Sequence, residues 1–404
     1  MNKDYKRAKL YVIIFLVSIS FVFLVYLANQ MNYGTPYYIG GSDDLVYEQE
    51  GLEVYNANIY NPSKIIESKI LGYFHNAPFF AIYMSGLIGF SNLFDGYSTF
   101  LPRIANVYYL IWICIILENL FKKYTRFNHQ KISIILGLFG LAPIIQYINS
   151  HVFRDTFNLL QILLIVYLFD KLVSNKNYTR KILLLVSLAF LVYITYYTRI
   201  NSLAFAGVLC FLLLGEKIKI KKKNLFLVTI PIVIVSIMNL GEILRINKFI
   251  NGYTNYLLEG SSGFSSFVFS QSILPFGFIL RMFYAFMSPF PNIFGLFKDV
   301  PGILLDFTNL LIYLAVVVQI LAIPFIFKRI LKFDWVSLAF LTLFFAIILT
   351  TFTFRHSIIY YPFLVALAVD GFMSSSKKFR SAILYSSFFI GTILGLIYMI
   401  LKLL

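Results

Sequence analysis

Long apolar segments separated by short basic loops constrain this chain more than any other feature. About eleven such segments follow one another, most of them ~15–25 residues long, near the length that an α-helix needs to cross a bilayer. Lysine and arginine gather in alternate loops, of which Lys217–Lys223 is the most basic, as the positive-inside rule predicts. The pattern predicts an all-α polytopic membrane protein whose N-terminus is cytoplasmic.

Composition agrees with this prediction. The 404 residues are 59% hydrophobic and 13% charged, whereas soluble domains carry about 25% charged residues. The net charge of +16 follows loop positions, so it indicates topology and no nucleic-acid partner. Cys114 and Cys210 fall inside apolar runs, so no disulfide framework is expected. We expect residues 1–404 to form a single integral membrane domain.

The expected spans, in chain order, are Leu10–Ala28, Ile104–Phe121, Ile132–Ile148, Phe157–Val173, Ile182–Tyr197, Leu203–Leu214, Leu225–Leu240, Ile303–Phe327, Trp335–Thr351, Ser357–Val369 and Ser381–Leu401. The sixth and the tenth are short, and we expect them to extend into their flanks. Two more apolar blocks, Leu71–Phe94 and Ile273–Phe297, would break the charge alternation if they crossed. The first is therefore predicted to be an outer interfacial helix, and the second an interfacial or re-entrant element. Residues 29–103, 149–156 and 241–302 become outer loops.

Polar residues with a possible chemical role gather on the outer side of this topology. Five of the 18 acidic residues fall between Asp43 and Glu53, while the basic cytoplasmic loops show no comparable pairing with acids or histidines. The outer candidates are Asp43, Asp44, Glu48, His75, Arg103, His151, Arg154, Asp155, Arg199, Arg281, Arg355 and His356. A single arginine of this set is most simply a helix-end anchor, but charges near hydrocarbon tend to face a cavity or a partner. The whole set therefore predicts a site.

The chemistry of these candidates suits group transfer from a lipid phosphate. The planar fork of arginine makes paired hydrogen bonds to phosphate, and a carboxylate can take the proton of an attacking hydroxyl. We expect Asp44 or Asp43 to be the base, with a slight preference for Asp44, and Asp155 to assist. Substrate binding is expected from Arg154, Arg199, Arg281, Arg355, His356, His75 and Arg103. No HExxH, P-loop, GxSxG or CxxC pattern occurs, so zinc proteases, NTPases, α/β hydrolases and thiol enzymes receive no support.

Four short motifs follow one another in the first 160 residues. They are the acidic pair Asp43-Asp44, the proline-containing segment His75–Phe80, the arginine-led segment Leu101–Asn106 and the pair Arg154-Asp155. Their order resembles that of membrane glycosyltransferases with the GT-C fold, especially bacterial relatives of the protein O-mannosyltransferases and aminoarabinose transferases. The late segment Arg355–Leu364 resembles their arginine-then-proline pattern, and Tyr284–Gly295 is similar to membrane proteins of polysaccharide clusters. The chain departs from the first family in showing one proline, Pro78, where two are usual.

The resemblance implies a glycosyltransferase of the bacterial cytoplasmic (inner) membrane that uses a polyprenyl-(di)phosphate-linked sugar or oligosaccharide. The acceptor would be a hydroxyl of a saccharide, lipid or glycolipid at the outer face of the membrane, in synthesis of envelope polysaccharide or glycolipid. A divalent cation is possible but not required. Two alternatives stay open, namely a polysaccharide repeat-unit polymerase and a transporter or flippase for lipid-linked sugars. Transporters tend to show internal repeats, interrupted helices and polar groups at the midplane.

Overall fold

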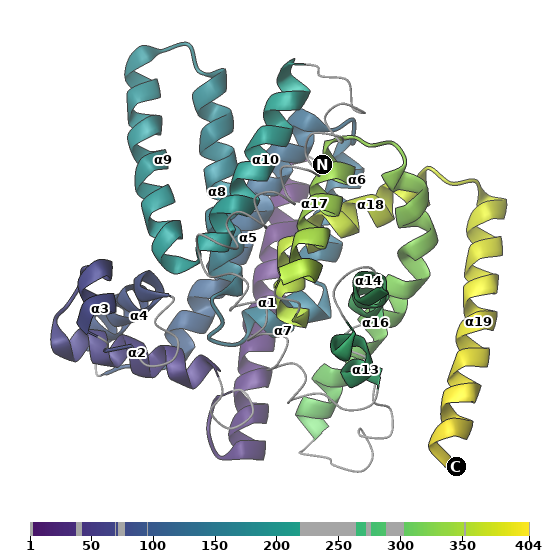
Figure 1. Cartoon of the computed structure of the whole chain (residues 1–404), viewed down its shortest axis with the longest axis horizontal. Coiled ribbons are helices and arrows are strands. Elements are labelled where there is room, and N and C mark those ends of the chain that lie inside the picture. Colours follow the sequence, from purple (N-terminus) through teal and green to yellow (C-terminus); the bar gives the residue numbers. More distant parts are fainter. Residues whose placement is uncertain are drawn as a thin grey trace.

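The computed structural model describes residues 3–37, 43–68, 70–71, 77–94, 96–218, 264–271, 276–287, 303–350 and 353–403. Over these ranges the chain forms helices, turns and short links without a strand (Figure 1), so the predicted all-α class is confirmed. The elements are α1 (Lys3–Tyr33), α2 (Asp43–Ala57), α3 (Pro62–Ser68), α4 (Pro78–Ser91), α5 (Phe100–Tyr124), α6 (His129–Gly140), α7 (Pro143–Asn149), α8 (Asp155–Ser174), α9 (Tyr178–Thr198), α10 (Ile200–Ile218), α13 (Phe264–Ser270), α14 (Phe278–Met287), α16 (Ile303–Ile330), α17 (Trp335–Thr350), the 3-10 helix η3 (Phe354–Ile359), α18 (Tyr361–Met373) and α19 (Lys377–Leu403).

Six helices within the described ranges are long and apolar enough to cross a membrane. They are Arg7–Tyr33 of α1, α5, α8, α9, α10 and Leu310–Ile330 of α16, and each contains or overlaps an expected span. The helix α10 extends beyond Leu203–Leu214 at both ends, as predicted. The expected span Leu225–Leu240 lies outside the described residues, and α17 and α18 are shorter apolar helices. A membrane protein is thus supported, while the total of eleven spans stays a prediction.

The segment predicted as one span at Ile132–Ile148 is instead a broken helix. The helices α6 and α7 meet at a bend of 54° and would make a seventh crossing only if counted together. The break falls before Pro143, which has no N–H to continue the α6 hydrogen bonds and fits the first turn of a new helix. The Gln146 side chain donates to the carbonyl oxygen of Gly140 at the end of α6. This oxygen therefore keeps a hydrogen-bond partner inside the protein although the helix is interrupted.

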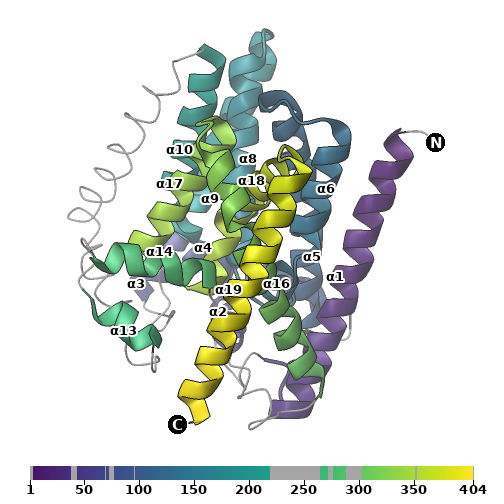
Figure 2. The same cartoon turned by 90° about the vertical axis from the view of Figure 1, so that its right-hand side faces the viewer.

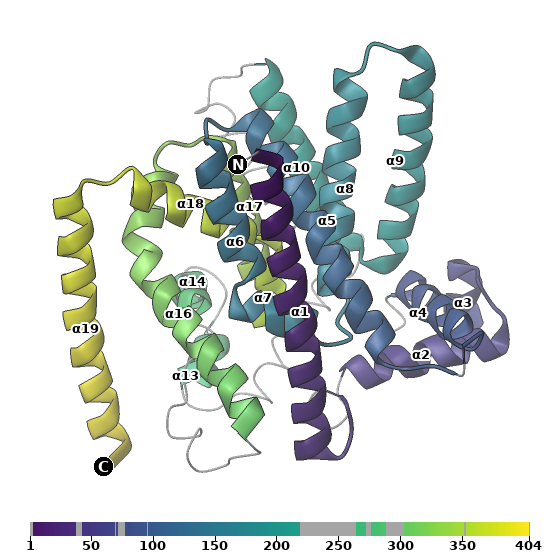
Figure 3. The ribbon, with the colours of Figure 1, turned by 180° about the vertical axis from the view of Figure 1, so that it is seen from behind.

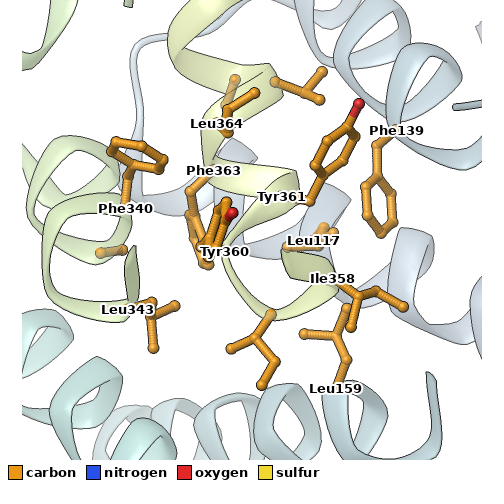
Figure 4. Packing of buried hydrophobic residues seen from close by; sticks show 14 of the residues in the cluster. Leu117, Phe139, Leu159, Phe340, Leu343, Ile358, Tyr360, Tyr361, Phe363 and Leu364 are labelled. Atoms are coloured by element: carbon orange, nitrogen blue, oxygen red, sulfur yellow. The ribbon is translucent and has the colours of Figure 1, made fainter. Parts of the chain in front are cut away.

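The packed centre of the bundle lies among α5, α8, α10, α17 and α18. Figure 4 shows Phe340 of α17, Phe363 of α18 and Tyr360, the residue between η3 and α18, packed beside Leu117 of α5 and Leu159 of α8. The helix α18 is buried over nearly its whole length, and it continues directly from η3. The short helix η3, which holds Arg355 and His356, is therefore fixed to the core.

Helices α2 and α4 lie across the long helices at one end of the bundle (Figures 1 and 3). The helix α4 has 14 residues and begins at Pro78, which is too short for a full crossing and in keeping with the interfacial helix predicted for Leu71–Phe94. The helix α14, within the second block Ile273–Phe297, also runs across the bundle (Figure 2). We call the end that carries α2, η3 and residues 150–154 the site end.

The opposite end, called here the basic end, carries the basic helix termini and three acids that bind them. The pairs are Glu118 with Arg7 and Lys122, Asp170 with Lys123 and Lys217, and Asp370 with Lys131 and Arg329. The expectation that the basic loops lack such pairing is therefore wrong. These acids belong to helices that look apolar in sequence, and only the packing of helix ends brings them to lysines from other segments.

Candidate active site

The acids of α2 lie on two adjacent faces of the helix. Asp43, Tyr47 and Glu50 share one face because they are spaced by four and three residues, and Asp44 and Glu48 share the next. The rotation of α2 about its axis is set by α4. A Cβ at Gly51 would lie 2.6 Å from Met84 Cβ, so only glycine allows this close approach. Packing against α4 thus decides what each acidic face meets.

Asp44 belongs to a fully buried ion pair with Arg103 of α5. The carboxylate oxygen and guanidinium nitrogen are 3.8 Å apart, and neither side chain is exposed. Arg103 also donates to the backbone oxygens of Ser150, at 3.1 Å, and Pro36. These bonds join the segment after α1, the helix α2 and the turn after α7. Asp44 and Arg103 therefore hold the site end together.

Glu48, one turn further along the same face, is held by two tyrosines. The hydroxyls of Tyr37 and Tyr97 each donate to one oxygen of the carboxylate at 2.7 Å. Both oxygens of this buried acid are thereby satisfied. The sequence predicts Glu48 on the outer side but carries no sign of its tyrosine partners, because they come from segments before and after α2.

Asp43, on the other face, forms an ion pair with Arg355 of η3, a residue 312 positions away. The Arg355 guanidinium also lies 4.2 Å from the ring centroid of Phe153. Burial would lower the pKa of Arg355, but the carboxylates of Asp155 and Asp43 raise it above its ordinary value. The side chains of Asp43 and Arg355 keep 23% and 20% of their surface exposed. This pair is therefore permanently charged on the arginine side and accessible.

A second cluster of distant residues joins the start of α8 to η3. Asp155 lies 3.4 Å from Arg199, in the turn between α9 and α10, and Arg199 lies 2.8 Å from Nε2 of His356. Arginine can only donate, so this nitrogen accepts and carries no proton. The 3.9 Å approach of the same Nε2 to Asp155 would be an ion pair only with a protonated ring, and the arginine contact argues against that form.

Arg154 and His151 complete the turn between α7 and α8. The Arg154 guanidinium lies 5.5 Å from the ring centroid of Tyr47, on the α2 face that also holds Asp43 and Glu50. His151 is buried, its Nδ1 is 2.8 Å from the Tyr147 oxygen, and its ring stacks on Phe153. Burial and the charge of Arg103 lower the pKa of His151 to about 3, so the ring is neutral near pH 7 and serves packing.

The structure thus brings together most of the predicted site residues, namely Asp43, Asp44, Arg103, Arg154, Asp155, Arg199, Arg355 and His356. Arg281 stands apart, because its described contact is with the Phe269 ring at 5.3 Å on α13. His75 lies outside the described residues. No group of three or more His, Cys, Asp or Glu side chains in the described part of the chain is arranged to hold a metal ion.

Glu50 is a site-end residue that the candidate set did not include. Its side chain is 4% exposed, and its Oε1 has no hydrogen-bond partner among the described residues. Burial, with a smaller contribution from Glu53, raises the pKa of Glu50 from 4.5 to about 7, against the opposing charge of Arg154. Its spacing from Asp43 by seven residues was the available signal, since that spacing returns to the same helix face.

We expect Glu50→Gln to remove a pH dependence of stability. The folded state favours the protonated carboxyl, so this stabilisation is complete below about pH 4.5 and is lost as pH rises through about 7. The difference in unfolding free energy between variant and wild type should grow in favour of the variant, by up to about 3 kcal/mol, toward pH 8. Thermal unfolding from pH 5 to 8.5 measures it. A difference that stays constant with pH would contradict the assignment.

Comparison with protein-family models, with curated proteins and with solved structures finds no match to this chain. The class of protein is therefore described from its own helices and site residues. Over its described residues it is a helical membrane protein in which carboxylates and arginines from α2, α5, α8, the α9–α10 turn and η3 meet at one end of the bundle.

Proposed function

We propose that the chain is a membrane glycosyltransferase that transfers a sugar or oligosaccharide from a polyprenyl-(di)phosphate donor to an acceptor hydroxyl. The observation that carries the proposal is the accessible pair of Asp43 and Arg355, with Arg154, Asp155 and Arg199 around it. A carboxylate that can accept a proton lies beside a guanidinium that can bind a phosphate. Both groups are what this transfer requires at its two ends.

In the proposed reaction the acceptor oxygen attacks the anomeric carbon and its proton passes to a carboxylate. The bond between that carbon and the phosphate oxygen breaks, and the polyprenyl (di)phosphate leaves with the electron pair. Asp43 is the better base, in place of Asp44, which the sequence slightly favours. Asp44 is fully buried against Arg103, whereas Asp43 is partly exposed.

Arg355 is proposed to receive the leaving phosphate. Its fork now faces the Asp43 carboxylate, and a phosphate offers oxygens of similar geometry and larger charge. Exchange of the carboxylate for the phosphate would release Asp43 to take the acceptor proton. Asp155 would act indirectly, because it holds Arg199 in place and Arg199 in turn contacts His356.

A polymerase of lipid-linked repeat units would use the same chemistry with a saccharide acceptor. A flippase is the second candidate, and the broken pair α6–α7 is the observation that favours it, since interrupted helices are common in transporters. The site charges gather at one end of the bundle, which fits the transferase better than a midplane pathway.

The leaflet in which lipid-linked saccharide accumulates separates these functions. A strain of the source organism that lacks this chain should lose an envelope polysaccharide or glycolipid and accumulate its polyprenyl-linked precursor in the outer leaflet. Wild-type chain should restore the product and an Asp43→Asn chain should not. Accumulation in the inner leaflet would favour the flippase, and an unchanged envelope would contradict the proposal.

The proposal also places the site end outside the cell. A cysteine at Leu93, which follows α4 and is 76% exposed, should react with an impermeant thiol reagent in intact cells. A cysteine at Tyr178, 77% exposed at the other end of the bundle, should react only after permeabilisation. Cys114 and Cys210 are buried, so the background is low. The reverse pattern would invert the topology.

Arg355→Lys should lower activity about tenfold or more, because a lysine keeps the charge but not the paired hydrogen bonds of the fork. The matched control is Arg281→Lys, since Arg281 is not joined to the Asp43 group by any described contact. Product formation at equal protein levels measures both. Wild-type activity in Arg355→Lys would remove the proposed phosphate contact.

A further inference from the structure

A cavity of about 350 Å³ lies beside the α9–α10 turn, which holds Arg199. One wall is a single face of α3, formed by Ser63, Ile66 and Glu67, whose spacing of three and four residues places them together. The other wall is the end of α9, with Tyr196 and Tyr197. The Ser63 and Tyr197 hydroxyls are 3.0 Å apart and join the two walls.

The cavity and the charged cluster share the backbone of the α9–α10 turn. Ile200 lines the cavity, and the preceding residue, Arg199, contacts Asp155 and His356. Neighbouring Cα atoms are about 3.8 Å apart, so a molecule in the cavity would reach within a few ångströms of the backbone that positions Arg199. A ligand with two connected rings could occupy the cavity and extend toward the cluster.

The lining selects the chemical class of the ligand. The volume is at the lower end of the roughly 300–1,000 Å³ typical of small-ligand pockets. Its polar side chains carry three hydroxyls (Ser63, Tyr196 and Tyr197), which donate and accept, and one carboxylate (Glu67), which accepts. Glu67 is the only charged residue in the described lining, so a phosphate would be repelled. Tyrosine rings offer flat amphipathic surface, which suits the apolar face of a sugar ring.

We infer that this cavity is the binding site for a neutral saccharide, and that it holds the sugar of the acceptor. The acceptor role rests on the proposed transferase function. The binding of a saccharide rests only on the residues that line the cavity. In this arrangement the phosphate of the donor binds at the arginines of the site end, and the uncharged sugar of the acceptor binds between α3 and α9.

Photolabelling of the purified full-length chain in nanodiscs tests the inference. The probe is an alkyl maltoside with a diazirine on its terminal glucose, and labelled peptides are mapped by mass spectrometry. We expect labelling at residues 63–67 and 196–200 that excess dodecyl maltoside suppresses and dodecylphosphocholine, with the same tail and no sugar, does not. Equal suppression by both, or uniform labelling along α9, would show a tail or interface contact and overturn the inference.

Two substitutions at exposed positions refine the test without loss of the fold. Glu67→Gln and Tyr196→Ala should each lower labelling about fivefold, the effect of one lost hydrogen bond or ring contact. Tyr178→Ala, at a more exposed tyrosine at the other end of α9, should not change it. Labelling that neither Glu67→Gln nor Tyr196→Ala lowers would contradict the assignment of the ligand to this cavity.

The readout is binding, so it separates this inference from the proposed function. Asp43→Asn should label like wild type although it is expected to lose transfer. Cavity labelling in a protein shown to have no transferase role would leave the saccharide site standing. Transfer that continues unchanged in Glu67→Gln and Tyr196→Ala, with the acceptor concentration for half-maximal rate unaltered, would overturn the acceptor role alone.

Discussion

Asp43→Asn should lower the rate of glycosyl transfer about 10²–10⁴-fold, the usual cost of losing a general base. Asparagine keeps the size of the side chain but cannot accept the proton of the acceptor hydroxyl. The substitution should leave the fold nearly intact, because Asp43 and Arg355 are partly exposed and such pairs contribute roughly 0–1 kcal/mol. Product formation at matched protein levels and thermal unfolding measure the two effects separately.

The matched control for Asp43→Asn is Glu53→Gln on the same helix. Glu53 is exposed and was given no part in the site, so its variant should transfer sugar at the wild-type rate. Asp43→Glu keeps a carboxylate but displaces it, and should recover part of the activity. A wild-type rate in Asp43→Asn would remove the base from the proposed mechanism.

Asp44→Asn should lower the stability of the fold, whereas Asp43→Asn should lower the rate of transfer. Removal of one partner from a buried ion pair leaves the other charge uncompensated and typically costs about 3–5 kcal/mol. Arg103→Met should have a similar cost, and its loss also leaves the Ser150 and Pro36 oxygens without their donor. The double variant should be destabilised by clearly less than the two single effects together, since neither charge is then stranded.

The buried thiols of Cys114 and Cys210 provide the measurement. A dye that fluoresces on reaction with thiols reports their exposure as the protein unfolds, so no label has to be introduced. We expect both single variants to unfold at a lower temperature than wild type, and Asp43→Asn to unfold close to wild type. Single variants as stable as wild type would show that the Asp44–Arg103 pair is not structural, and the reason for preferring Asp43 as the base would fall with it.

Much of the fold could be predicted from local sequence. A bilayer-length apolar segment has to satisfy its backbone polar groups internally, which favours a helix wherever the run is long enough. Six described helices accordingly coincide with expected spans. The bend before Pro143 has a sequence signal, the proline itself, but the run on both sides of it is apolar enough to look continuous.

The charged residues of the site could be chosen from sequence, because acids and arginines are costly beside hydrocarbon. Their partners could not. Asp43 and Asp44 are neighbours in sequence but point about 100° apart around the helix, so one meets Arg355 and the other Arg103. The close packing of Gly51 on Met84 decides that rotation, and no local pattern in α2 encodes it.

The sequence by itself therefore determined that the chain is helical, where most of its long helices lie and which side chains are chemically notable. The tertiary structure decided the pairs, including Asp155 with Arg199, Glu48 with two tyrosines, and the acids of the basic end with their lysines. The physical reason is the distance along the chain over which each interaction acts. Helix formation depends on residues within a few turns, whereas an ion pair depends on how helices far apart in the chain pack and rotate against each other.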